Sequence, residues 1–344
     1  MHCPGYPRCP DYPVSLGRVI HLILERHMAE PFERINLQRV IAVINGKGGV
    51  GKTTLTANIG GMLAASGWRT LVVDLDHQGN LGLDLGYSGT AIDDDGQALS
   101  KALTYPDDLA HPASNVRPNL DVLVGGRFIE NAAATLVSQS TRGGDSLQQA
   151  RLSLARVLDR IAGEYDVILL DCPPGNDIIQ SAAVAAARYI LIPAKTEDAS
   201  RKGLKLTAER LDQVIDLNPD LDLLGVVLFA SGASASRVRA DFAAKVVADL
   251  GGEAARDVVF ENYVRHAEAT AASARDKGLL VHELDDKVRK SPKWYERLKK
   301  GEAVESPGPQ SAQSVADSLQ AVTSEMIARL MAKEAEAATE EAHV

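Results

Sequence analysis

The sequence contains few cysteines and few aromatic residues, and each shortage excludes a class of protein. Only three of the 344 residues are cysteine, at Cys3, Cys9 and Cys172, which rules out a disulfide-stabilised scaffold. Cys3 and Cys9 lack the usual spacing of zinc ligands and have no second ligand pair nearby. Aromatic residues make up 4% of the chain, whereas alanine, valine and leucine are plentiful, as is typical of helices packed on a parallel sheet.

Long apolar runs and an excess of positive charge are also missing. No apolar run approaches the roughly 20 residues of a membrane-spanning helix, so we expect a cytoplasmic protein without a membrane partner. The net charge is −9, so any DNA contact must come from a local basic patch. The length allows one large α/β domain with appendages or two small domains, and we favour one domain.

The most informative segment of the sequence is residues 39–54, which read RVIAVINGKGGVGKTT. Residues 40–44 form a short β-branched run typical of a buried parallel strand, and a helical pattern of apolar residues begins at Leu55. Between strand and helix lies Gly46-x-x-x-x-Gly51-Lys52-Thr53, the spacing of a phosphate-binding P-loop. The alternative interpretation is a glycine-rich turn without a ligand.

The chemistry of a P-loop explains these residue types. Glycines let backbone N–H groups turn inward around phosphate oxygens, and the helix that follows adds the positive end of its dipole. We therefore predict ATP and Mg²⁺ as cofactors, with Lys52 reaching the β- and γ-phosphates and the Thr53 hydroxyl binding Mg²⁺. The predicted nucleotide-binding residues are Gly46, Lys47, Gly48, Gly49, Val50, Gly51, Lys52, Thr53 and Thr54.

Two further strand patterns end in carboxylates. Residues 70–76 end in Asp74 and Asp76, and residues 165–171 end in Asp171 after four apolar residues, as in a Walker B strand. The carboxyl ends of strands are where open α/β sheets bind ligands, so we predict that Asp171 helps to hold Mg²⁺. The alternative for Asp74 and Asp76 is that each caps the following turn.

Strand and helix patterns alternate along the rest of the chain. This alternation predicts an α/β fold, a doubly wound and mostly parallel sheet flanked by helices. Residues 81–118 are predicted to be loop and short helix, with Asp93, Asp94 and Asp95 in a solvated turn rather than a metal site. The predicted strands are 119–125, 189–193, 223–229 and 258–260, and the predicted helices are 129–137, 146–162, 177–187, 200–217 and 236–250.

Several of these motifs together resemble the ParA/MinD family of ATPases. A second lysine, Lys47, gives the KGGVGKT of a deviant P-loop. VDLDHQGN at 73–80 resembles the family's VDxDPQGN, DCPPG at 171–175 its switch II, and YVRHAEA at 263–269 its NVRLSEA. The resemblance extends over residues 39–285. The sequence departs from the family where His77 replaces proline and Lys195 replaces glutamine, which leaves the adenine contacts open.

The resemblance implies a ParA-type, Soj-like partition ATPase that forms a homodimer on ATP. Lys47 would reach across the dimer to the partner's ATP, Asp76 would orient the attacking water, and Asp74 would support the water shell of the metal. The predicted catalytic residues are Lys47, Lys52 and Asp76. A ParB-like centromere-binding partner would stimulate hydrolysis and release the protein from nonspecific DNA, which implies a nucleoid-associated location. The alternative for Lys47 is a solvated loop lysine.

A basic segment near the C-terminus is the clearest candidate for binding DNA. Residues 287–300 contain seven basic residues and one acidic residue, with Trp294 and Tyr295 among them. A solvated helix face is the alternative. The candidate DNA-binding residues are Arg265, Lys287, Arg289, Lys290, Lys293, Arg237 and Arg239.

We divide the chain into an N-terminal extension (1–38), an ATPase domain (39–300), a linker (301–310) and a C-terminal helix with an acidic tail (311–344). The terminal helix has an apolar stripe at Val315, Leu319, Val322, Met326 and Leu330. Acidic residues from Glu334 onward would be repelled by an anionic bilayer, so we expect the stripe to pack on the body or on a partner.

Two functional alternatives remain open. A protein of the same family could position another cargo, such as a protein compartment or a division system. A metabolic P-loop enzyme could use the same fold with a small carboxylate or a redox partner. Cys172 does not favour a redox role, because one cysteine per chain cannot supply the four ligands of an iron–sulfur cluster in a symmetric dimer. We therefore expect Cys172 to be a packing residue.

Overall fold

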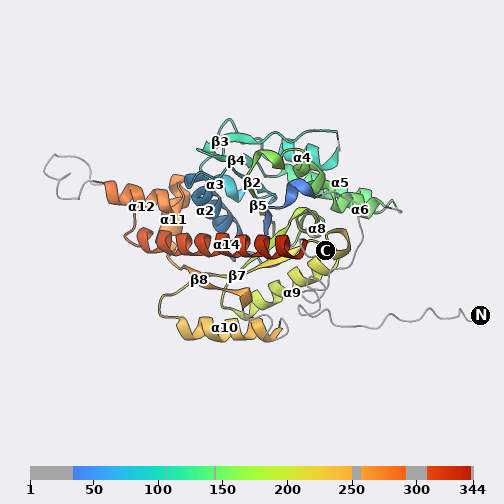
Figure 1. Cartoon of the computed structure of the whole chain (residues 1–344). Coiled ribbons are helices and arrows are strands. Elements are labelled where there is room, and N and C mark those ends of the chain that lie inside the picture. Colours follow the sequence, from blue (N-terminus) through green and yellow to red (C-terminus); the bar gives the residue numbers. More distant parts are fainter. Residues whose placement is uncertain (1–33, 106, 143–144, 250–256, 292–307, 342–344) are drawn as a thin grey trace, which may run out of the picture.

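The computed structural model describes residues 34–105, 107–142, 145–249, 257–291 and 308–341 (Figure 1). Their central element is an eight-stranded sheet in the order β3-β4-β2-β5-β1-β6-β7-β8. Every neighbouring pair is parallel except β3 and β4, which are antiparallel. This architecture confirms the predicted α/β fold class.

The strands at the centre of the sheet are buried along their whole length. All residues of β1, β2, β5 and β6 are buried, as expected for continuous apolar runs with helices on both faces. The pairing of β2 with β5 places Asp74 opposite Asp171 at the carboxyl ends of both strands. The strands are β1 Val40–Val43, β2 Thr70–Asp74, β3 Ala113–Arg117, β4 Leu120–Leu123, β5 Val167–Asp171, β6 Tyr189–Ala194, β7 Asp222–Ser231 and β8 Val259–Arg265.

Helices cover both faces of the sheet and form two hydrophobic clusters. One cluster joins the sheet to α4, α5, α7, α8, α9 and α10, and the other joins it to α2, α11, α12 and α14. The helices are α2 Lys52–Ala65, α3 Asn80–Asp84, α4 Gln97–Thr104, α5 Phe128–Ser140, α6 Ser146–Arg151, α7 Ser153–Asp159, α8 Asp177–Ala186, α9 Asp198–Asp212, α10 Ser236–Asp249, α11 Glu268–Lys277, α12 Val281–Lys290 and α14 Ala312–Glu341. Short 3₁₀ turns occur at Ile35–Leu37, Ala162–Glu164 and Ile215–Leu217.

The long helix α14 lies across one face of the molecule (Figure 1) and contacts β8, α12 and α2. Its apolar stripe is buried in the same cluster as α2, which confirms that the stripe packs on the body. Polar contacts reinforce this packing: Arg39 donates two hydrogen bonds to Glu334, and Lys333 pairs with Asp222 at 2.8 Å. The acidic residue Glu334 therefore serves to fix the helix on the sheet.

Two stretches differ from the sequence-based expectation. Residues 81–118, expected to hold no strand, contain β3, whose polar sequence ASNVR is half-exposed at the sheet edge and lacks the alternation of a typical strand. The helix expected over 146–162 is divided at Leu152 into α6 and α7. The division buries Leu152 and leaves Leu147, which the helical pattern assigned to the buried face, 40% exposed.

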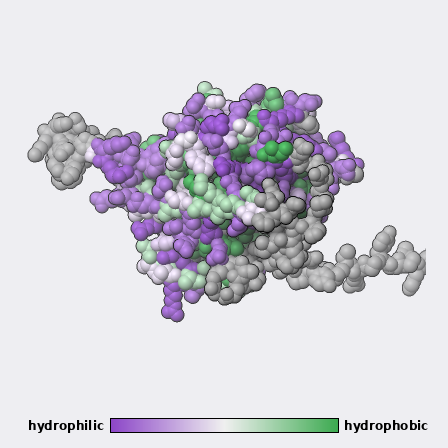
Figure 2. Space-filling view, viewed as in Figure 1, coloured by the Kyte–Doolittle hydropathy of each residue, from purple (hydrophilic) through white to green (hydrophobic). Residues whose placement is uncertain are grey.

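No helix among the described residues is both long enough and apolar enough to cross a membrane. Figure 2 shows that hydrophilic residues dominate the described surface on the face that carries α14. Large exposed apolar side chains on the described part of the molecule include Ile35, Tyr105 and Leu109.

Candidate nucleotide-binding site

The loop between β1 and α2 has a backbone that requires glycine. Gly49 and Gly51 have φ values of 71° and 91°, in the left-handed region that favours glycine, and Gly51 is the N-cap of α2. A side chain at position 51 would also overlap the ring of Phe229 on β7, whereas nothing lies within 4 Å of a Cβ placed on Gly49. The loop is therefore packed on one side and open on the other.

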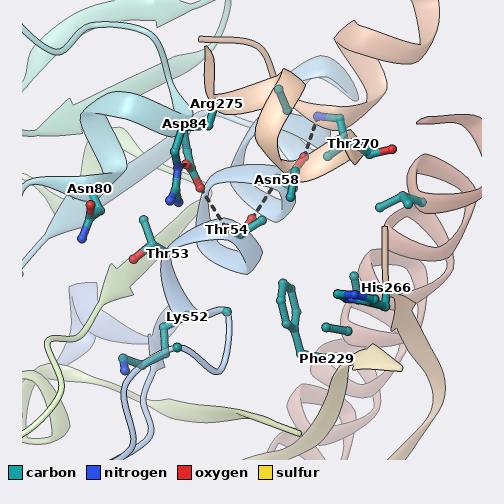
Figure 3. A pocket seen from close by; sticks show the side chains of 18 of the residues that line it. Lys52, Thr53, Thr54, Asn58, Asn80, Asp84, Phe229, His266, Thr270 and Arg275 are labelled. Atoms are coloured by element: carbon teal, nitrogen blue, oxygen red, sulfur yellow. Dashed lines mark hydrogen bonds and ion pairs between the residues drawn. The ribbon is translucent and has the colours of Figure 1, made fainter. Parts of the chain in front are cut away.

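The open side of the loop faces a cavity of about 610 Å³ (Figure 3), a volume typical of small-molecule sites. Its other walls come from Asp76 after β2, from Phe229 and from the segment that joins β8 to α11. Most of the predicted nucleotide-binding residues line it, namely Gly48, Gly49, Gly51, Lys52, Thr53 and Thr54. Gly46, Lys47 and Val50 do not belong to its walls, and Val50 is fully buried beneath the loop.

Lys52 lies at the base of the cavity. Its side chain is almost completely buried, and Nζ donates a hydrogen bond to the backbone oxygen of Lys47 at 3.0 Å. Burial lowers the pKa of Lys52, and the neighbouring Asp171, Cys172 and Asp76 act in the opposite direction. An ammonium group surrounded by so little water interacts strongly with any phosphate that enters.

Asp74 and Asp171 form a pair of buried carboxylates next to the loop. Oδ2 of Asp74 and both carboxylate oxygens of Asp171 lack a standard hydrogen-bond partner among the described residues. Burial raises the pKa of Asp171 to about 7, opposed by the Thr53 hydroxyl and the Lys52 ammonium. Burial and then the charge of Asp171 raise the pKa of Asp74 well above its ordinary value.

These orphaned oxygens fit a hydrated Mg²⁺. Buried carboxylate oxygens normally have partners, and Mg²⁺ is usually bound by one or two carboxylates together with water and phosphate oxygens. The described residues contain no group of three or more histidine, cysteine or acidic side chains that could hold a metal. A magnesium ion here would therefore depend on the nucleotide and on the Thr53 hydroxyl as well as on Asp171.

Asp76 lies at the wall of the cavity, after the end of β2. Only 6% of it is exposed, and Oδ1 accepts a hydrogen bond from the backbone N–H of Gln78 at 3.0 Å. Nδ1 of His77, the residue that stands in place of the family's proline, is 3.4 Å from the same oxygen. The turn therefore still directs this carboxylate into the cavity, as its predicted role requires. Cys172, which directly follows Asp171 in the chain, is buried, as expected of a packing residue.

The side chain of Lys47 points away from the nucleotide cavity of its own subunit. Its Nζ pairs with Oε2 of Glu197 at 2.7 Å, and Glu197 is the residue before α9. The loop is fixed at this point because the buried Asn45 accepts from the backbone N–H of Lys47 and donates to the oxygen of Pro193. The hydrogen bond and charge of Lys47 lower the pKa of Glu197.

Three of the candidate DNA-binding arginines belong to one end of the sheet. Arg265 ends β8 opposite Ser231, is exposed and lines the cavity. Arg239 donates to the oxygen of Gly232, and its guanidinium lies 3.7 Å from the centre of the Tyr263 ring. Arg237 is exposed on the same first turn of α10.

Three other candidates, Lys287, Arg289 and Lys290, lie on α12, apart from α10 in Figure 1. Arg289 pairs with Asp285 and Asp286, and Lys290 pairs with Asp286, so acids of the same helix partly neutralise these cations. Lys287 is exposed. Lys293, Trp294 and Tyr295 lie outside the described residues. DNA binding by either group stays a prediction.

Sequence reasoning missed several residues of the site. The ring of Phe229 packs against Gly51 of the loop, and Glu197 forms an ion pair with Lys47. Asp84 and Arg275 face the cavity from α3 and α11. Asp84 is a buried acid in the otherwise apolar segment LGLDL, which could have marked it, whereas nothing in the sequence around Arg275 distinguishes it from a solvated helix residue.

Comparisons with known proteins agree with this geometry. A family model described as an AAA domain matches residues 38–223. The chromosome partitioning protein ParA of Myxococcus xanthus is 32% identical over 253 residues, which cover 72% of this chain and 83% of that protein. The chain belongs to the ParA/MinD family of ATPases.

Other members of the ParA/MinD family and a related fold extend the comparison. The sporulation initiation inhibitor protein Soj of Bacillus subtilis is 30% identical over 250 residues, covering 71% of this chain and 91% of that protein. The structure of cobyrinic acid a,c-diamide synthase from Mycobacterium smegmatis with ADP and magnesium has a TM-score of 0.56 at 25% identity, covering 79% of this chain and 99% of that chain. The resemblance first detected in the KGGVGKT, VDLDHQGN and DCPPG segments is thereby confirmed.

Proposed function

We propose that this chain is a ParA-type partition ATPase that closes into a homodimer around two molecules of ATP with Mg²⁺. The observation that carries the proposal is the position of Lys47. This lysine belongs to the phosphate-binding loop, yet its ammonium group points away from its own cavity and pairs with the exposed Glu197. Because an exposed ion pair contributes little, Lys47 can leave Glu197 for a stronger partner at low cost.

Within one subunit, the proposed roles follow from charge and burial. The loop and the buried Lys52 hold the β- and γ-phosphates, while Thr53 and Asp171 hold Mg²⁺, with Asp74 supporting its water shell. When bound, Mg²⁺ neutralises charge on the phosphate oxygens. Asp76, directed into the cavity by its turn, orients the attacking water for in-line displacement.

Across the dimer, the partner's copy of Lys47 would complete each site. Charge develops on the phosphoryl group during transfer, and a cation supplied by a second subunit stabilises it in the manner of an arginine finger. Hydrolysis would then require the dimer, because a monomer lacks this cation at its γ-phosphate.

The dimer would also bring two sets of basic residues together. We propose that Arg265, Arg237 and Arg239, with Lys287 and its neighbours on α12, bind nonspecific duplex DNA. A protein with a net charge of −9 binds DNA through such local patches, and doubling the patch on dimerisation makes binding depend on ATP. A ParB-like centromere-binding protein would stimulate hydrolysis and release the dimer, so that plasmid or chromosomal DNA is segregated.

DNA co-sedimentation tests the proposal. The protein is mixed with duplex DNA in ATP, in ADP and without nucleotide, each across a salt series. We expect pelleting only with ATP, with binding that falls steeply as salt rises, because phosphate contacts release counterions. Binding that is equal in all three nucleotide conditions, or absent in all, would contradict it.

The same experiment distinguishes a partition ATPase from a second candidate, a metabolic P-loop ligase, which the likeness to cobyrinic acid a,c-diamide synthase supports. A ligase of that kind would hydrolyse ATP only with a small carboxylate substrate and would ignore DNA. A positioning ATPase with another cargo would still dimerise on ATP, and pelleting with anionic liposomes would distinguish a membrane-linked version from a DNA-bound one.

A further inference from the structure

One buried carboxylate in the nucleotide cavity has no role in the mechanism above. Asp84, at the end of α3, is 8% exposed, and both of its oxygens have partners. Oδ2 accepts a hydrogen bond from Oγ1 of Thr54 at 3.0 Å, and Oδ1 accepts one from Nε of Arg275 at 2.7 Å. Figure 3 shows Asp84 and Arg275 beside Thr54, on the side of the cavity that carries Thr53.

The segments that carry this pair are fixed to one another. Arg117 on β3 donates to the backbone oxygens of Leu85 and Gly278 and makes two hydrogen bonds with Glu283, which joins the end of α3 to the α11–α12 turn. Asn58 on α2 donates to the oxygen of Thr54 and accepts from the N–H of Val281. Arg275 is therefore held next to the P-loop helix by contacts on both of its sides.

The guanidinium of Arg275 has donors to spare. It carries five N–H groups, of which the one on Nε bonds to Asp84. Within the described part of the chain, its terminal nitrogens have no protein partner, and 47% of the side chain is exposed. Arg275 lines the same cavity as Lys52 and Thr53, so these terminal N–H groups are available to an anion there.

Charge balance supports the same conclusion. A buried carboxylate beside a polyphosphate would repel it, because charges in a site with little water interact strongly. Arg275 neutralises Asp84, and the hydrogen bond that Arg275 donates to the Asp84 carboxylate raises the pKa of Arg275. The pair is neutral overall, and it presents to a nucleotide the oriented N–H donors of the guanidinium in place of an unpaired carboxylate.

We propose that Arg275 binds the α-phosphate of the nucleotide and that Asp84 is the positioning residue that orients its guanidinium. This proposal rests on ATP binding as proposed above. Lys52 and Thr53 serve the β- and γ-phosphates and the metal, and Thr54 is the next residue along α2. Apolar residues such as Ala271 and Leu279 also line this cavity and suit the ribose and the base, so we assign the phosphate beside Arg275 as the α-phosphate.

Isothermal titration with ATP and with ADP, each with Mg²⁺, tests the proposal in Arg275→Gln, which removes the charge. We expect the Kd of both nucleotides to rise about tenfold, as for the loss of a hydrogen bond to a charged group. Lys277→Gln is the matched control, since Lys277 has the same charge on the same helix but does not line the cavity, and its Kd values should stay unchanged. Arg275→Lys, which keeps the charge, should retain more affinity than Arg275→Gln.

A double variant separates phosphate binding from a structural role. In Arg275→Gln the carboxylate of Asp84 is no longer neutralised, so adding Asp84→Asn should restore part of the affinity. Further loss in the double variant would overturn the charge argument, unchanged Kd values in Arg275→Gln would overturn the proposal, and a loss confined to ATP would overturn the α-phosphate assignment. A wild-type protein that binds no nucleotide would instead overturn the proposed function.

Discussion

At the residue scale, the site depends on which charged groups are buried and which are exposed. Lys52, Asp74 and Asp171 are held in a nearly water-free environment, where their interactions with phosphate and metal are strong. Lys47 and Glu197 lie toward solvent, where their mutual attraction is screened. The two lysines of the loop are therefore suited to different tasks, one to retaining a nucleotide and the other to moving between partners.

The role of Asp171 in magnesium binding gives a prediction at this scale. In the wild type, Mg²⁺ should tighten ATP binding, and Asp171→Asn should remove most of that gain because a neutral amide replaces the carboxylate. The measurement is the Kd of ATP with Mg²⁺ and with a chelator. Asp166→Asn is the control, since Asp166 precedes the same strand but pairs with Arg69 outside the cavity. An Asp171→Asn variant with the full magnesium effect would contradict the assignment.

Single residues were predictable where the chemistry depends on neighbours in sequence. Lys52, Thr53, Asp76 and Asp171 follow from a loop spacing and from strand ends. The structure brings the first three to one cavity and buries Asp171 beside Thr53 and Lys52. Glu197 and Arg275 were not predictable, because each acts through a partner far away in the chain, Lys47 and Asp84 respectively. The order of charged residues along the sequence does not show which of them pair in the folded chain.

At the element scale, the helix α14 is part of the core rather than an appendage. Its buried stripe shares a hydrophobic cluster with α2, the helix that begins at the phosphate-binding loop. Thr323 of α14 donates to the sulfur of Met62 on α2. Packing of α14 therefore supports the helix on which the nucleotide site depends.

Two methionines on α14 provide a matched test of this packing. Met326 is fully buried and Met331 is 50% exposed. Met326→Ala should lower the free energy of unfolding by about 2–5 kcal/mol, because it leaves a cavity in the core. Met331→Ala should change it by less than about 0.5 kcal/mol. Urea denaturation measures both, and equal effects of the two substitutions would contradict the described packing.

Helices and strands were predictable where apolar residues run continuously or recur at a regular spacing. The central strands β1, β2, β5 and β6 are apolar throughout, and each was expected within a residue or two of its bounds. The edge strand β3 was missed because its polar residues are ordered by pairing with β4, not by burial. The division at Leu152 was missed because tertiary packing, and not helix propensity, decides which leucine is buried.

At the scale of the whole molecule, the carboxyl ends of the strands carry the loop, the acidic pair and Arg265 at one edge of the sheet. This common edge is the face through which we propose that two subunits meet. Closing the dimer there would cover both nucleotides, exchange the Lys47 ammonium groups and bring the basic residues of β8 and α10 from both subunits together. One event would thus link nucleotide state to DNA binding.

The molar mass in solution tests this central proposal most directly. Light scattering on the wild type should give the 36.7 kDa protomer without nucleotide and twice that mass with ATP and Mg²⁺. Lys47→Ala should bind ATP yet stay at the protomer mass, while Lys195→Ala, another lysine at the cavity, should still dimerise. A wild type that stays at 36.7 kDa with saturating ATP, or a Lys47→Ala variant that dimerises normally, would contradict the account.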